Sequence, residues 1–243
     1  MDNASNIALS RMVAQFRALD LTAGNLANAT TPGYHAERMM FGDWLSRQHG
    51  GLGGNIVYTQ DRASYRERQS GEFTHTANPL DLAITGDGYF TVLGPSGPRL
   101  TRAGHFTLDT DGTIADEQGD ALLDPQGRKL QLTTADTHIS VAGDGTLSSE
   151  NGQIGKIAIV NASDPNRLKA EGNRLLNAAD TTTSPVATPR IVQGALEQSN
   201  VQPALEVSRM TNDLRTFQML SQFMQSEAER QQGAIDKIMQ QRS

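Results

Sequence analysis

The acidic segment at residues 109–112 is the nearest approach in this sequence to a metal-binding motif. It reads Asp-Thr-Asp-Gly, and Asp120 stands at the twelfth position of a loop that would begin at Asp109. A calcium loop of that length needs glycine at its sixth position to allow a sharp turn, and Ile114 stands there. The Asp-Gly pair instead favours a tight β-hairpin turn. We therefore expect no metal site in this segment.

Other arrangements that could carry chemistry are also incomplete. The glycines at 50–54 lack the Gly-Lys-Ser/Thr signature of a phosphate loop, and Asp116 and Glu117 are an isolated carboxylate pair. The chain has no cysteine and no Gly-x-Ser-x-Gly nucleophile motif. The histidines are scattered, without the spacing of metal ligands: His35, His49, His75, His105 and His138. The sequence predicts no catalytic residue, no cofactor and no metal, and so a protein that is not an enzyme.

Composition narrows the class of partner. The 243 residues carry a net charge of −6 and no run of Lys and Arg, which argues against nucleic-acid binding. No apolar run approaches the ~20 residues needed to span a bilayer, so we expect no direct membrane insertion. Residues 1–6 lack the features of a secretory signal, and we expect no cleavable signal peptide.

Two segments near the ends repeat apolar residues with alternating spacings of three and four. This period of 3.5 is typical of coiled-coil-forming helices, although an ordinary helix with one buried face is the alternative. The polar members Ser221 and Gln231 make the second stripe imperfect, which predicts a helix that becomes ordered on assembly. The stripes are Leu9, Met12, Phe16, Leu19, Ala23 and Leu26, and Val207, Met210, Leu214, Phe217, Ser221, Met224, Ala228, Gln231, Ile235 and Ile238.

Between the helices, short apolar runs alternate with Asp-Gly, Asn-Gly and Pro-containing turns every eight to twelve residues. That spacing is typical of an antiparallel, hairpin-rich β domain. We predict an α+β fold in four parts: an N-terminal axial helix (1–30), an extended or poorly ordered linker (31–75), an all-β domain (76–195) and a C-terminal axial helix (196–243). Asn200 is the expected cap of the second helix, with Pro203 in its first turn.

The residues at the helix ends resemble a known family. Residues 25–34 are similar to the segment with which flagellar rod, hook and hook-associated proteins end their first helix, and 194–201 to their entry into the last. Residues 78–90 and 101–112 look like the first core strands and the next hairpin of these proteins. The opening residues 1–10 resemble the proximal-rod branch, with a distal-rod or hook subunit as the alternative. The motif residues are Asn25, Leu26, Ala27, Asn28, Pro32, Gly33, Tyr34, Gly194, Leu196, Glu197, Ser199, Asn200 and Val201.

The resemblance implies a structural subunit of the bacterial flagellar basal-body rod. Such a subunit would self-assemble through its paired terminal helices to build the drive shaft for motility. Its expected partners are further copies, paralogous axial subunits and the flagellar export apparatus, and its expected location is the rod that spans the periplasm. The stripe residues apart from Ser221, Ala228 and Gln231 are the predicted assembly interface. A cell-wall-acting β-domain enzyme and a secreted coiled-coil protein are the alternatives, and no motif supports either.

Overall fold

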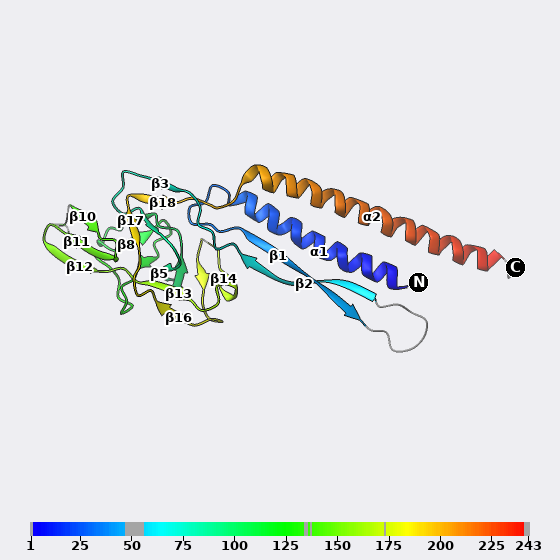
Figure 1. Cartoon of the computed structure of the whole chain (residues 1–243), viewed down its shortest axis with the longest axis horizontal. Coiled ribbons are helices and arrows are strands. Elements are labelled where there is room, and N and C mark those ends of the chain that lie inside the picture. The colour runs from blue at the N-terminus through cyan, green and yellow to red at the C-terminus, as the bar shows by residue number, and fades with distance from the viewer. Residues whose placement is uncertain (1, 47–55, 134–135, 137, 173, 241–243) are drawn as a thin grey trace. The chain divides into compact units, whose positions relative to one another are not determined.

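The structure, a computed structural model, describes residues 2–46, 56–133, 136, 138–172 and 174–240. It confirms the α+β class, with a helix near each end and antiparallel strands between them (Figure 1). The chain forms two compact units. The first comprises Met1–Ala27, Glu37–Tyr65 and Gln202–Ser243, and the second comprises Asn28–Ala36 and Arg66–Val201. Within the described ranges, neither helix is apolar enough over a sufficient length to cross a membrane.

The first unit contains α1 (Asp2–Ala27), β1 (Glu37–Ser46), β2 (Ile56–Arg66) and α2 (Pro203–Gln240). The two helices lie side by side and run in opposite directions (Figure 1). The side-chain amide of Gln15 on α1 donates to a carboxylate oxygen of Asp213 on α2 at 2.7 Å. With 38 residues, α2 is about 57 Å long at 1.5 Å per residue.

The segment predicted as a linker, residues 31–75, contains regular structure. β1 and β2 pair as a two-stranded sheet, and β1 contacts α1. β2 opens with Ile56-Val57-Tyr58-Thr59, residue types that favour strands, although the Arg-rich sequence after it obscures that signal. His49 and the glycines at 50–54 lie outside the described residues.

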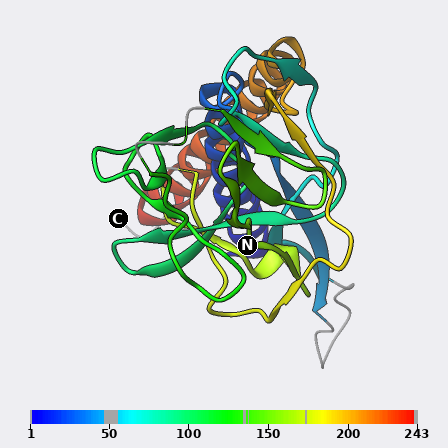
Figure 2. The ribbon, with the colours of Figure 1, turned by 90° about the vertical axis from the view of Figure 1, so that its left-hand side faces the viewer.

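Every other strand belongs to the second unit, whose green and yellow strands face the viewer in Figure 2. The largest described sheet runs β14-β15-β6-β5-β9-β8-β7, and β13 joins it by pairing with β5 and β16. β10, β11 and β12 form another sheet, and β17 pairs with β4 and β18 with β3. The elements are β3 (Phe73–His75), β4 (Leu82–Ile84), β5 (Tyr89–Gly94), β6 (Gly97–Thr101), β7 (Phe106–Leu108), β8 (Ile114–Asp116), β9 (Ala121–Leu122), β10 (Ile139–Val141), β11 (Thr146–Ser149), β12 (Gly152–Lys156), β13 (Ile159–Ala162), the 3-10 turn η1 (Pro165–Arg167), β14 (Lys169–Ala170), β15 (Leu176–Asn177), β16 (Thr183–Pro185), β17 (Ile191–Gln193) and β18 (Ala195–Glu197).

The apolar runs of the sequence supply the core of the second unit. Phe90 and Phe106 are fully buried, with ring centroids 5.5 Å apart and ring planes nearly perpendicular. β5 alternates half-buried and buried residues from Tyr89 to Gly94, as a strand with one face on a core requires. This core holds the segments before and after it, 66–70 and 197–201, in one compact body.

Candidate functional site

The two halves of the family motif meet in the second unit. The backbone amide of Gly33 donates to the carbonyl of Glu197 at 2.8 Å, and that of Asn200 donates to the carbonyl of Tyr34 at 3.3 Å. Segments more than 160 residues apart in the sequence are therefore paired through their backbones. The motif thus joins the segment that follows α1 to the segment that precedes α2.

Gly33 occupies a position that only glycine fits. Its φ is +72°, in the left-handed region, and a Cβ built there would lie 2.5 Å from the backbone nitrogen of Ala103. Residues with a side chain adopt this conformation at a cost and could not approach the neighbouring backbone so closely. The Pro-Gly pair therefore serves close packing as well as the end of the helix.

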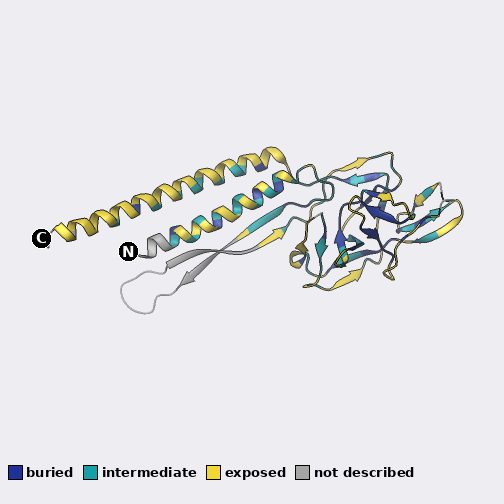
Figure 3. Ribbon diagram, turned by 180° about the vertical axis from the view of Figure 1, so that it is seen from behind, coloured by how far each residue is buried: buried dark blue, intermediate teal, exposed yellow. Residues whose placement is uncertain are grey.

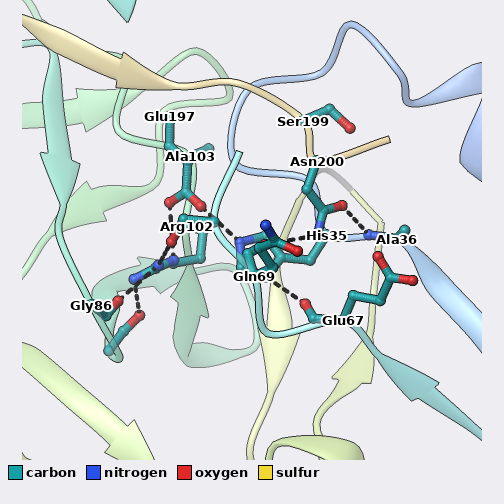
Figure 4. A network of polar contacts seen from close by, with 12 residues as sticks. His35, Ala36, Glu67, Gln69, Gly86, Arg102, Ala103, Glu197, Ser199 and Asn200 are labelled. Atoms are coloured by element: carbon teal, nitrogen blue, oxygen red, sulfur yellow. Dashed lines mark hydrogen bonds and ion pairs between the residues drawn. The ribbon is translucent and has the colours of Figure 1, made fainter. Parts of the chain in front are cut away.

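A buried polar network connects these segments (Figure 4). The ring of His35 contacts the Glu197 carboxylate at 2.9 Å through Nε2 and the Glu67 carbonyl at 2.9 Å through Nδ1. Nε of Arg102 lies 3.1 Å from the other Glu197 oxygen, an ion pair without hydrogen-bond alignment. The side chains of His35, Arg102 and Glu197 are 8%, 5% and 1% exposed, so solvent screens these contacts weakly.

Arg102 is also anchored to the backbone of the turn at residues 86–88. It donates to the carbonyl of Gly88 at 2.8 Å and to that of Gly86 at 2.9 Å. These contacts satisfy the two terminal nitrogens of the guanidinium, whereas Nε has no hydrogen-bond partner and only its ion pair with Glu197. In the sequence, His35 is one of the scattered histidines, and no role was predicted for Arg102. Glu197, in the motif segment 194–201, was the signal in the sequence for a cationic partner.

Asn200 has a different role from the one predicted. α2 begins at Pro203, and the carbonyl of Gln202 accepts the amides of Leu205 and Glu206. The side chain of Asn200 instead accepts from the amide of Ala36 at 2.7 Å and donates to the carbonyl of Gln69 at 2.8 Å. The prediction that Asn200 caps the helix is wrong, because backbone groups of two other segments use its amide.

Asn25, the first motif residue, acts in the same way within the first unit. Its amide donates to the carbonyl of Glu37 at 2.8 Å and accepts from the amide of that residue at 2.9 Å. Asn25 is 1% exposed. An asparagine has a donor and an acceptor in the right arrangement to pair with one residue of a strand. It therefore fixes the start of β1 against the end of α1.

The remaining motif residues shape the turns. Asn28 accepts the amide and the hydroxyl of Thr31, and Gly194 has a φ of +69°. The Ser199 hydroxyl accepts from the amide of Val201, which is buried. Leu26, Ala27, Pro32 and Leu196 have apolar side chains and are half-buried or exposed.

The predicted interface stripes divide into two series, each with a spacing of seven residues (Figure 3). One series is half-buried: Met12, Leu19 and Leu26 on α1, and Met210, Phe217, Met224 and Gln231 on α2. The other is exposed: Leu9, Phe16 and Ala23 on α1, and Val207, Leu214, Ser221, Ala228 and Ile235 on α2. The side chain of Ile238 lies outside the described residues. A single chain therefore covers one half of each stripe.

The covered face of α2 also includes polar residues that the stripe omitted. Glu206, Asp213 and Glu227 are buried or half-buried and, like the apolar Leu220, lie one position before the exposed series. Glu206 is fully buried and pairs with Arg38 of β1 at 2.8 Å. Arg209, one turn later on α2, binds the same carboxylate at 2.9 Å. These acids were missed because a search for apolar periodicity passes over them.

The segments weighed as chemical sites have structural roles. Residues 109–113 form a hairpin turn in which Asp111 accepts the amide of Thr113 at 2.9 Å, and this hydrogen bond lowers the pKa of Asp111. His105 contacts Asp81 at 2.6 Å. Over the described part of the chain, no three side chains of His, Cys, Asp or Glu are placed to hold a metal ion.

Three family models match the sequence in the order of these elements. They are described as "Flagella basal body rod protein" for residues 6–35, "Flagellar hook protein FlgE/F/G D1 domain" for 83–149, and "Flagellar basal body rod FlgEFG protein C-terminal" for 192–236. The matches include most of each helix, both motif segments and strands β5–β11 and β18.

Whole proteins of this kind are also similar to the chain. The flagellar basal-body rod protein FlgF of Caulobacter vibrioides is 32% identical over 241 residues, which cover 98% of both proteins. FlgF of Mesorhizobium japonicum is 31% identical, again over 98% of both. The rod protein FlgG of Caulobacter vibrioides is 31% identical over 90% of this chain and 92% of that protein.

Proposed function

Because this chain belongs to the flagellar basal-body rod protein family and is a FlgF-like structural subunit, we propose that it joins the rod through the exposed faces of its two terminal helices. It is not an enzyme, and it functions in the basal body of the flagellum together with other axial subunits.

The division of the stripes carries this proposal. Phe16 is 63% exposed, Val207 50% and Leu214 41%, although each continues a heptad pattern whose other half is covered within the chain. Burying one such side chain contributes about 1.5–3 kcal/mol. A row of them on a helix is the surface that coiled-coil packing with neighbouring subunits would cover. The motif does not supply this surface, and instead holds the helix-bearing segments in place.

The last part of α2 adds a second exposed surface. Gln15 contacts Asp213, and the helices are antiparallel, so Asp2 at the start of α1 lies opposite the region of Ser226. Within the described residues, 228–240 have no part of α1 opposite them. Ile235 is 54% exposed and Met239 70%. We propose that a helix of a neighbouring subunit covers this end.

The names of the relatives support a position within the rod. Relatives named FlgF match over 98% of this chain and of their own length, so we assign the chain to the proximal-rod position, with a distal FlgG-type position as the alternative. We further propose that it passes through the flagellar export apparatus and reaches the rod that spans the periplasm. Helices whose apolar faces are only half covered would unfold readily for such export.

The experiment compares Leu214→Asp and Phe16→Asp with Gln225→Asp in a strain whose own copy is deleted. Gln225 is exposed and lies outside the apolar series, so it receives the same charge without entering the proposed interface. We expect the first two variants to abolish swimming and incorporation into basal bodies, while the purified proteins keep the wild-type helix content. Normal swimming by both Leu214→Asp and Phe16→Asp would refute the proposed interface.

A further inference from the structure

A small cavity in the second unit has a lining that assembly does not explain. Its volume is about 140 Å³, and it shares His35 and Arg102 with the polar network. Two further arginines, Arg66 and Arg68, line it together with Tyr89. Such a volume holds about four water molecules or one small oxyanion.

The arginines of this lining are not equivalent. Arg102 donates hydrogen bonds to the carbonyls of Gly86 and Gly88, and its charge is paired with that of Glu197. It therefore attracts an anion in the cavity only in part. Arg68 is exposed and, among the residues that the structure describes, makes neither an ion pair nor a hydrogen bond. It is therefore the cation in this lining that is available to a ligand.

Polar groups without charge complete the lining. Burial raises the pKa of the Tyr89 phenol above its usual value, although Arg66, Arg102 and Arg68 act against that shift. The hydroxyl is consequently neutral at physiological pH and can donate a hydrogen bond. The guanidinium of Arg102 lies 6.0 Å from the centre of the Tyr89 ring and helps to hold it in place. Asn161 adds a side-chain amide.

We propose that this cavity binds a small oxyanion, a carboxylate or a phosphate, with Arg68 as its main ligand and the Tyr89 hydroxyl and Asn161 amide as further donors. The planar guanidinium matches the two oxygens of such a group. The lining also contains Glu67 and Asp87, whose carboxylates oppose an anion, so binding depends on the donors of Arg68, Tyr89 and Asn161 rather than on an excess of positive charge. The anion is either free in solution or presented by an acidic side chain of a neighbouring subunit.

Titration of the purified full-length protein with inorganic phosphate and with acetate, followed by calorimetry and by NMR shifts, tests the site. We expect Arg68→Gln to weaken binding about tenfold, the loss of one charge-assisted hydrogen bond. Asp87→Asn, which removes an opposing charge, should strengthen binding. Arg190→Gln is the matched control, because Arg190 is exposed and does not line the cavity. No binding by the wild type, or equal binding by Arg68→Gln, would overturn the proposal.

Swimming of the Arg68→Gln strain separates the two sources of the anion. If phosphate binding is lost and swimming persists, the ligand is a free anion. If binding and incorporation are both lost while the purified variant keeps its thermal stability, the carboxylate comes from a neighbouring subunit. Because the binding assay uses the isolated protein, a negative result in it would not count against the proposed helix interface. In the same way, a result that refutes the helix interface would not count against the anion site.

Discussion

Replacing Glu197 with glutamine tests whether the buried ion pair holds the two motif segments together. The substitution keeps the shape of the side chain and removes its charge, which leaves Arg102 with the carbonyls of Gly86 and Gly88 as its remaining partners. Breaking one side of a buried pair costs about 3–5 kcal/mol. Because Arg102 keeps these carbonyl contacts, we expect the lower end, about 3 kcal/mol.

Denaturation of the purified protein, followed by near-ultraviolet circular dichroism, measures this loss. For a chain of this size, about 3 kcal/mol corresponds to a fall in Tm of roughly 6–12 °C. A double-mutant cycle with Arg102→Met should give a coupling energy of about 1–3 kcal/mol. Glu171→Gln is the control, because Glu171 is 37% exposed and pairs with Arg99 at the surface, so its loss of stability should be much smaller. Equal losses in the two glutamine variants would refute the reasoning.

Three further results are expected. Gly33→Ala should destabilise the second unit by more than Gly86→Ala, since both have positive φ but only Gly33 would bring its Cβ against backbone; equal Tm values would contradict the packing argument. Asn25→Ala should cost about 1–3 kcal/mol in chemical denaturation, because it removes the hydrogen bonds that the Asn25 side chain makes with the half-buried backbone amide and carbonyl of Glu37; a neutral effect would mean that water replaces the amide. Hydrogen bonds lower the pKa of Asp111 and Asp144 in the folded protein, so their contribution is present above the unfolded value of about 3.9 and is lost as pH falls through the folded value. Stability measured between pH 6 and pH 2 should therefore fall less steeply in Asp111→Asn and Asp144→Asn, and identical slopes would contradict these shifts.

The parts that could be predicted from the sequence are those with local signals. Leu82–Ile84, Phe106–Leu108 and Ile139–Val141 are strands in the structure, as their bounding turns indicate. Leu130 and Leu132 are buried, but residues 130–132 form no named strand, because among them only Gln131 makes a bridge, to Thr113. Periodicity reports burial more reliably than it reports backbone pairing.

What the sequence does not reveal depends on contacts between distant residues. The ring of His35 contacts the carboxylate of Glu197, 162 positions away in the sequence. The residues next to either one in the sequence give no sign of this contact. β1 and β2 are held partly by Asn25, whose local setting resembles that of any helix end. Each stripe is half covered because it has a partner helix on one side only. The periodicity of the sequence shows which residues share a face of the helix, but not how much of that face a partner covers.

The placement of the motif explains why several of its residues are polar or small. Gly33, Asn25 and Asn200 each meet backbone groups of another segment, where an apolar side chain would leave a buried donor or acceptor unsatisfied. The apolar residues of the terminal helices face the opposite demand, because half of each stripe has no cover within the chain. Charge at Leu214 should therefore abolish assembly and spare the fold, whereas loss of charge at Glu197 should weaken the fold first. If charge at Leu214 weakened the fold, or if loss of charge at Glu197 abolished assembly and spared the fold, the motif and the stripes would not have these separate roles.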